Sequence, residues 1–122
     1  MTFVRIRLSV ATSNRLKSLK GRTGLTPNVL CRLALCYSLA DSHPLGPAVP
    51  DSDGLELNRA TLFGEREEVY LALLKQRMVN DAVGHELEDT LRAHIDRGVA
   101  LLAPRLKSVA DVTELLSEGG VA

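Results

Sequence analysis

Apolar and polar residues alternate from residue 2 to residue 10, and this period of two predicts a half-buried strand. Four apolar side chains would share the inward face of this strand: Val4, Ile6, Leu8 and Val10. The outward face would carry Phe3, Arg5, Arg7 and Ser9. No later segment shows so regular an alternation, so we expect one strand, at the front of the chain.

Two helices are predicted directly after the strand. Residues 11–22 form a short basic helix, and Gly24 supplies its end. Thr26 followed by Pro27 favours a second helix start, because threonine caps free backbone N–H groups and proline needs no N–H at the first helical position. The helix that follows, to about residue 40, is apolar almost all round, which predicts burial against several neighbours. Its two cysteines, Cys31 and Cys36, are expected to be buried thiols of the core.

The rest of the chain predicts a loop and three further helices. Three prolines and two glycines between residues 42 and 54 exclude a helix or a central strand there. Helices are expected over residues 65–80 and 85–102, and a last one is capped by Ser108. Their inward apolar positions would be Val69, Tyr70, Leu73 and Leu74 in the first, Leu87, Leu91, Ile95, Val99 and Leu102 in the second, and Val109, Val112, Leu115 and Leu116 in the third. The fold class is therefore mainly α, with an N-terminal strand.

The charges are segregated along a chain whose net charge is zero. Residues 1–42 hold seven Lys or Arg against one acid, while the remaining residues hold eight against fourteen. A length of 122 residues fits one domain, so we expect a single unit over residues 1–122. It would comprise a basic strand-helix-helix part (1–42), a Pro/Gly loop (43–54) and an acidic helical part (55–116). The asymmetry favours a surface that binds a polyanion; two solvated faces of unequal sign are the alternative.

A lone strand leaves its backbone N–H and C=O groups unpaired, so it needs a partner. The simplest partner is the same strand of a second chain, which would give a two-stranded ribbon on a helical core, as in ribbon-helix-helix proteins. Arg5 and Arg7 would then enter the major groove of DNA, unless they only solubilise the ribbon. The start of the second helix, at Thr26 and Asn28, would offer backbone N–H groups to a phosphate oxygen.

The sequence offers little support for catalysis, a cofactor or a membrane. The cysteines lack zinc-site spacing, so no metal site is expected, and no phosphate-binding GxxxxGK[ST] loop is present. His94, near Arg92 and Arg97 on its helix, has no serine or cysteine nucleophile adjacent in sequence. No catalytic residue and no cofactor are therefore predicted. The absence of a secretory signal pattern and of a long apolar run predicts a cytoplasmic protein without a membrane partner.

Several ordered blocks of the chain resemble one family. They are residues 5–9 (Arg-Ile-Arg-Leu-Ser), 15–20, 22–28, 31–35, 58–62, 73–77 and 91–99. Together they closely resemble the DNA sulfur modification protein family DndE, over most of the chain from Arg5 to about Asp111. Ordered blocks of this kind are more specific than a single short motif.

This resemblance implies a homo-oligomer, a dimer or a tetramer, that binds duplex DNA and prefers nicked DNA through surface lysines. Other DNA sulfur-modification proteins would be its partners, and Lys17 and Lys20 match the basic segment best. The DNA-binding residues that we expect are Arg5, Arg7, Arg15, Lys17, Lys20, Arg22, Thr26 and Asn28. The alternative function is that of a ribbon-helix-helix transcriptional regulator or antitoxin, which sequence-specific binding to an operator would favour.

Overall fold

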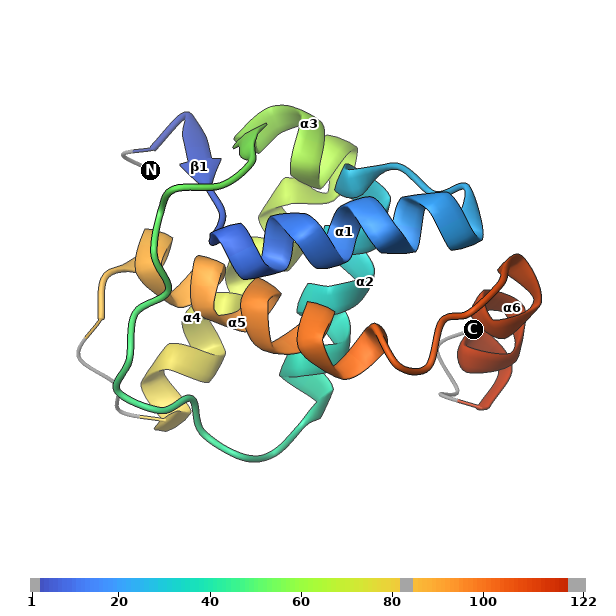
Figure 1. Cartoon of the computed structure of the whole chain (residues 1–122). Coiled ribbons are helices and arrows are strands. Elements are labelled where there is room, and N and C mark those ends of the chain that lie inside the picture. Colours follow the sequence, from blue (N-terminus) through green and yellow to red (C-terminus); the bar gives the residue numbers. More distant parts are fainter. Residues whose placement is uncertain (1–2, 82–84, 119–122) are drawn as a thin grey trace.

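The computed structural model describes residues 3–81 and 85–118, and it is mainly helical, as the sequence predicts. The elements in chain order are β1 (Arg5–Arg7), α1 (Val10–Thr23), α2 (Pro27–Ala40), β2 (Glu56–Asn58), α3 (Arg59–Phe63), a 3-10 turn (Gly64–Arg66), α4 (Glu67–Asp81), α5 (Leu87–Leu102) and α6 (Val109–Glu118). Helix α1 lies at the front in Figure 1, with α2 and α5 behind it. None of the helices described is long and apolar enough to cross a membrane.

The first strand is shorter than predicted, because Ser9 ends it. The Ser9 hydroxyl accepts a hydrogen bond from the Thr12 N–H at 3.1 Å, so α1 already begins at Val10. Val10 is consequently the first residue of α1 and is exposed. Val4, in a bend before β1, is also exposed, whereas Phe3 and Ser9 are buried instead of facing outward. The predicted inward positions of Ile6 and Leu8 are confirmed, since both are 1% exposed.

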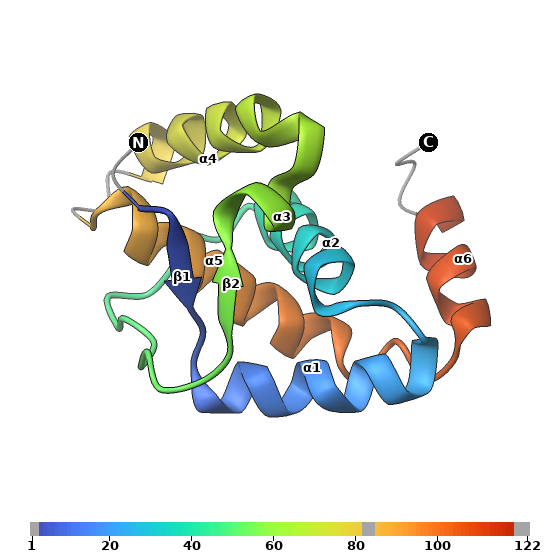
Figure 2. The same ribbon diagram turned by 90° about the horizontal axis from the view of Figure 1, so that it is seen from above.

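The partner of β1 lies in the same chain, so the premise for a ribbon shared between two chains was wrong. Strand β1 pairs antiparallel with β2, and Ile6 lies opposite Leu57. The two strands run side by side in Figure 2. Neither β2 nor α3 was predicted, because each is too short to show a period in the sequence. The backbone groups of β1 are thereby partly satisfied without a second copy.

Helices α2 and α5 form the centre of the molecule. The Thr26 hydroxyl caps α2 through the Val29 N–H, and Pro27 stands at its first position, as predicted. The stripe of α5 that was predicted to face inward is confirmed, with Leu91, Ile95, Val99 and Leu102 all at 0% exposure. Other buried members of the core are Leu16, Leu19, Leu30, Leu35, Phe63 and Leu106. The core is therefore built from helices of both halves of the chain.

Glycine at position 98 allows α2 and α5 to cross closely. A Cβ atom on Gly98 would overlap the backbone carbonyl of Ala34. Cys31 is buried at this centre, as predicted, but Cys36 is exposed, which corrects the expectation that both thiols are buried. Cys36 lies on the side of α2 that no other described element covers fully.

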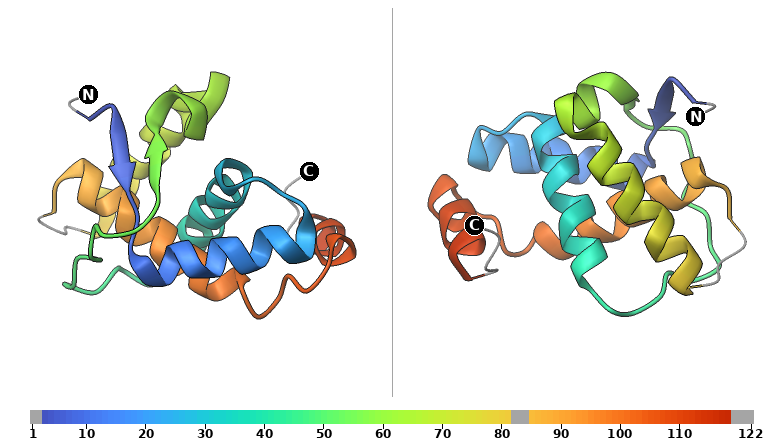
Figure 3. Two further views of the ribbon diagram at one scale, coloured as in Figure 1. Left: turned by 45° about the horizontal axis from the view of Figure 1, so that its top comes forward. Right: turned by 180° about the vertical axis from the view of Figure 1, so that it is seen from behind.

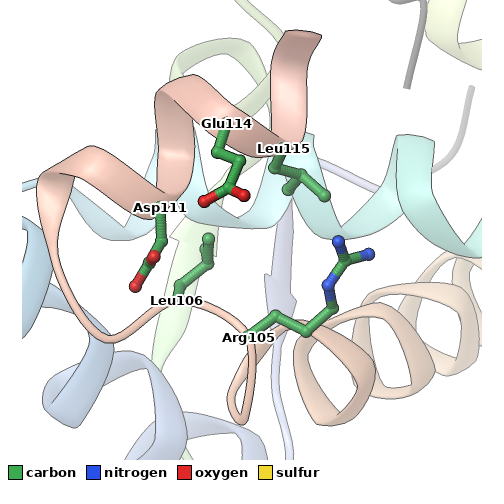
Figure 4. Close-up of a pocket in the computed structure, with 5 residues that line it drawn as sticks. All are labelled: Arg105, Leu106, Asp111, Glu114 and Leu115. Atoms are coloured by element: carbon green, nitrogen blue, oxygen red, sulfur yellow. The ribbon is translucent and has the colours of Figure 1, made fainter. Parts of the chain in front are cut away.

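The two helices that flank this centre are less buried than their patterns predicted. In α4 only Leu74 is fully buried, and Val69 and Leu73 are about half exposed. In α6 Val112 and Leu115 pack partly against the core, while Val109 and Leu116 are exposed. Figure 4 shows the small cavity between α6 and the preceding turn, with Leu115 near Arg105. Figures 1 and 3 place α6 at the end of the molecule opposite β1.

Candidate nucleic-acid interface

Helix α1 lies along one edge of the molecule (Figure 2). Its four buried residues are Thr12, Leu16, Leu19 and Thr23. At 100 degrees per residue these lie on one side of the helix, so the remaining positions face outward. The exposed side chains include Arg15, Lys17, Lys20 and Arg22, and α1 contains no acid. The predicted basic helix is thus an exposed cationic surface.

Three of these four cations have no partner among the residues that the structure describes. In residues 3–81 and 85–118, Arg15, Lys17 and Lys20 make no hydrogen bond or ion pair. Arg22 differs, because its guanidinium donates to the carbonyls of Ala103 and Leu106 at 3.2 and 3.3 Å. Arg22 therefore fastens the end of α1 to the turn after α5. Arg15, Lys17 and Lys20 keep their full hydrogen-bonding capacity for an external anion.

Arg5 and Arg7 lie on β1, in a surface of mixed charge. Arg7 forms an ion pair with Glu56 across the sheet at 3.8 Å and donates weakly to the Gly54 carbonyl at 3.4 Å. Both arginines line a cavity of about 360 Å³. Its other lining residues include Glu56, Glu88, Asp89 and Arg92. The acids offset the two arginines, so the positive potential here is weaker than along α1.

The start of α2 lies next to the α1 lysines. A groove of about 370 Å³ is lined by Ser13, Asn14, Leu16, Lys17, Lys20, Pro27 and Leu55. The Thr26 hydroxyl is engaged in capping, at 3.4 Å from the Val29 nitrogen, and Asn28 is half-buried. The structure thus brings Lys17 and Lys20 together with the first turn of α2. Arg5 and Arg7 belong to the separate cavity on the sheet.

Leu55 is the residue of this region that sequence reasoning missed. It is 39% exposed and follows the Pro/Gly loop, about 40 residues from the lysines that it faces. A single leucine after a loop gives no periodic signal, so only the folded chain shows the association.

A serine and a histidine meet inside the core. The Ser38 hydroxyl lies 2.8 Å from His94 Nδ1, and the Arg97 Nε–H donates to the same hydroxyl at 2.8 Å. The Ser38 hydroxyl thus connects the imidazole of His94 to the guanidinium of Arg97. Burial, then the charge of Arg97, lowers the pKa of His94 to about 4. Ser38 and His94 are both 0% exposed, so a substrate has no access to this pair.

Other candidate groups for chemistry lie in α2 and in the loop that follows it. Burial raises the pKa of Cys31 to about 12, which keeps its thiol protonated and inert. Residues 3–81 and 85–118 contain no group of three or more His, Cys, Asp or Glu that could hold a metal ion. His43 lies in the loop, 2.7 Å from Asp41, and its hydrogen bonds lower the pKa of that carboxyl.

Comparisons with known proteins find one matching family and similar solved structures. The sequence profile of the family described as DNA sulphur modification protein DndE matches residues 5–110. A search of curated proteins finds no match. The crystal structure of DndE from Escherichia coli B7A, described as involved in DNA phosphorothioation modification, is 33% identical with a TM-score of 0.72. The alignment covers 84% of this chain and 98% of that one.

A second solved structure is similar to the same extent. It is a DndE mutant with two glycine-to-lysine substitutions, described as involved in DNA phosphorothioation, with 30% identity and a TM-score of 0.70. The alignment covers 84% of this chain and 99% of that one. The family profile spans more than four fifths of the chain, from β1 to the start of α6. The chain therefore belongs to the DndE family of the DNA phosphorothioation system.

Proposed function

We propose that this protein is a non-catalytic subunit of the phosphorothioation machinery that binds duplex DNA, including nicked duplex, as a homo-oligomer. The observation that carries the proposal is the set of three unpartnered cations on α1, Arg15, Lys17 and Lys20, beside the first turn of α2. Free cations and backbone N–H groups at a helix start are the donors that DNA phosphates accept. The role would be to place DNA for other sulfur-modification proteins in the cytoplasm.

The magnitude of the electrostatic attraction supports this role. If the three α1 cations of each chain reach phosphates, a dimer neutralises about six of them. The slope of log K against log salt is then near −5, and affinity falls roughly a thousandfold between 50 and 200 mM salt. Arg5, Arg7 and Arg22 would add less, because acids or carbonyls of the protein already engage or surround them.

The contact between copies does not require β1. Because β1 is paired with β2, the strand has one edge less for a second chain than a ribbon-helix-helix protein offers. This pairing also argues against the alternative of a ribbon-helix-helix regulator or antitoxin, whose DNA-reading ribbon forms between two chains. We therefore propose binding through helix cations and the start of α2, with Thr26 and Asn28 contributing backbone donors.

The charge reversal Lys17→Glu with Lys20→Glu tests the proposal. Binding to nicked and to intact duplex of unrelated sequences should fall at least about a hundredfold in titrations at low salt, since four cations of a dimer become anions. The oligomer size, measured by light scattering, should stay the same. Lys75→Glu on α4 makes the same kind of change away from the α1 surface and should leave affinity within about threefold.

Two results would refute this assignment. One is wild-type affinity in the double variant, which would place the DNA elsewhere. The other is a strong preference for one operator sequence in competition against unrelated DNA, which would favour the regulator.

A further inference from the structure

The groove beside α1 has one apolar side and one cationic side. Leu16, Pro27 and Leu55 form the apolar side, and Lys17 and Lys20 form the cationic side. Its volume of about 370 Å³ lies within the range of small-ligand sites, about 300–1,000 Å³. The cavity at Arg5 and Arg7 is of similar volume, but Ile6 is its sole apolar lining residue and acids share it. The α1 groove thus combines apolar walls with cations, which the cavity at Arg5 and Arg7 does not.

The backbone that carries Leu55 is fixed against the start of α1. The Leu55 N–H donates to the Ser13 hydroxyl at 2.7 Å, and the Leu55 carbonyl accepts from the Leu8 N–H at 2.8 Å. The Gly54 N–H donates to the Leu8 carbonyl at 2.8 Å, and a Cβ on Gly54 would overlap Ser13 and the backbone of Ser9. Glycine thus lets the chain approach α1 closely enough to place Leu55 over the groove. A rigid, exposed leucine loses little conformational freedom when a ligand covers it.

We infer that this groove takes one unpaired nucleotide of a DNA strand, with its base against Leu55, Pro27 and Leu16 and its phosphates at Lys17 and Lys20. The inference rests on the proposed DNA binding and adds a specific ligand to it. The base of a nucleotide has apolar faces, and its phosphate is anionic. The apolar side of the groove matches the base, and the cationic side matches the phosphate. The groove is lined by residues of α1, by Pro27 at the start of α2 and by Leu55, which directly precedes β2. In Figure 2, β2 and the start of α2 lie on the same side of α1.

An unpaired base is required because a stacked pair cannot present a base face. Removing a base from the stack costs a few kcal/mol in a duplex and least where pairing or continuity is already interrupted. The groove would therefore favour a strand end at an interruption over a continuous duplex. Recognition would depend on base faces and phosphates, so it would tolerate many sequences.

The experiment uses the full chain and two duplexes that carry 2-aminopurine at the same position, one at the end of a nicked strand and one in a continuous strand. Emission of this base rises when it leaves the stack. We expect a rise of severalfold on protein binding to the nicked duplex and none on binding to the continuous one. Leu55→Ser should abolish most of the rise and weaken nicked-duplex binding about fivefold, with less than a twofold effect on continuous duplex.

Leu55→Met keeps an apolar side chain at the groove and is the matched control, so it should retain the rise. Circular dichroism of both variants checks that the fold is unchanged. Lys17- and Lys20-dependent binding without any change in emission would overturn the groove inference and leave the proposed function standing. Absence of DNA binding by the wild-type protein would overturn both. A rise that survives Leu55→Ser undiminished would also contradict the inference.

Discussion

The arginines of α5 and the cations of α1 are the same kind of residue in opposite situations. Arg92, with 7% of its side chain exposed, donates to the carbonyls of Arg7, Pro50 and Asp51 at 2.5 to 2.8 Å. Arg97 likewise donates to the carbonyls of Ser38 and His43. The α1 cations Arg15 and Lys17 make no such bonds within the described residues. One region uses positive charge to hold the chain together, and the other leaves it exposed to solvent.

The difference shows why net charge is a poor guide to this protein. The chain is neutral overall, yet arginines of its C-terminal half donate to backbone carbonyls of the loop between α2 and β2. The loop of residues 41–55 has no regular structure, and its carbonyls need donors where it lies against the core. Arg77, Arg92 and Arg97 supply them. On α1, by contrast, Arg15, Lys17 and Lys20 are exposed and have no partner among the described residues.

The largest expected effect is on folding, from Arg92→Ala. The substitution leaves three carbonyls without their donor and removes the contact between the loop, β1 and α5. We expect a loss of about 3 kcal/mol in the free energy of unfolding, measured by denaturant titration. DNA affinity per folded molecule should be unchanged. A loss below about 1 kcal/mol would contradict the structural role assigned to Arg92, because it would mean that the loop does not depend on this arginine.

A second test uses pH and the buried His94. Its folded-state pKa of about 4 lies below the ordinary histidine value of 6.5, so between these pH values the unfolded chain binds a proton at His94 and the folded chain does not. Stability should therefore fall as pH drops from about 6.5 to about 4, by up to about 1.4 kcal/mol per pH unit from this group. Denaturant titrations of wild type and His94→Gln across this window measure it. Equal pH slopes for the two proteins would show that His94 is not held neutral.

The third test separates two arginines of the same helix. Arg22→Ala loses hydrogen bonds to the Ala103 and Leu106 carbonyls, and stability should fall by about 1 kcal/mol. Arg15→Ala touches no protein partner in the described part of the chain, so stability should change by less than about 0.5 kcal/mol. DNA affinity should show the reverse order, with the larger loss, about threefold, for Arg15→Ala. The same loss of affinity in both would remove the distinction between structural and free cations.

The sequence predicted the helices wherever their ends carry a chemical signal. Thr26 with Pro27 and the left-handed Gly24 placed the boundaries of α1 and α2 within a residue or two. The strand was predicted too long, because the alternating pattern continues through Ser9 and Val10. In the structure Ser9 caps α1, so the helix begins where the pattern predicted strand. The segment with β2 and α3 was missed, since its pairing with β1 depends on contacts about 50 residues apart in the chain.

The candidate site was predictable in its charges and not in its shape. Lys17 and Lys20 stand out from the segregation of basic residues, and their exposure follows from the positions of Leu16 and Leu19 on the same helix. The groove with Leu55 requires the loop to return to α1, which no local pattern indicates. Glu56 likewise offsets the positive potential of Arg7 only because the pairing of β1 with β2 places the two residues opposite each other.

The salt dependence of DNA binding tests the role of the α1 cations most directly. Affinities of the wild-type protein and of Lys17→Ala with Lys20→Ala would be measured for one duplex at several salt concentrations. For a dimer we predict a log–log slope near −5 for wild type and near −2 for the variant, because two of three phosphate contacts per chain are removed. Equal slopes for the two proteins, or a wild-type slope near zero, would contradict the account.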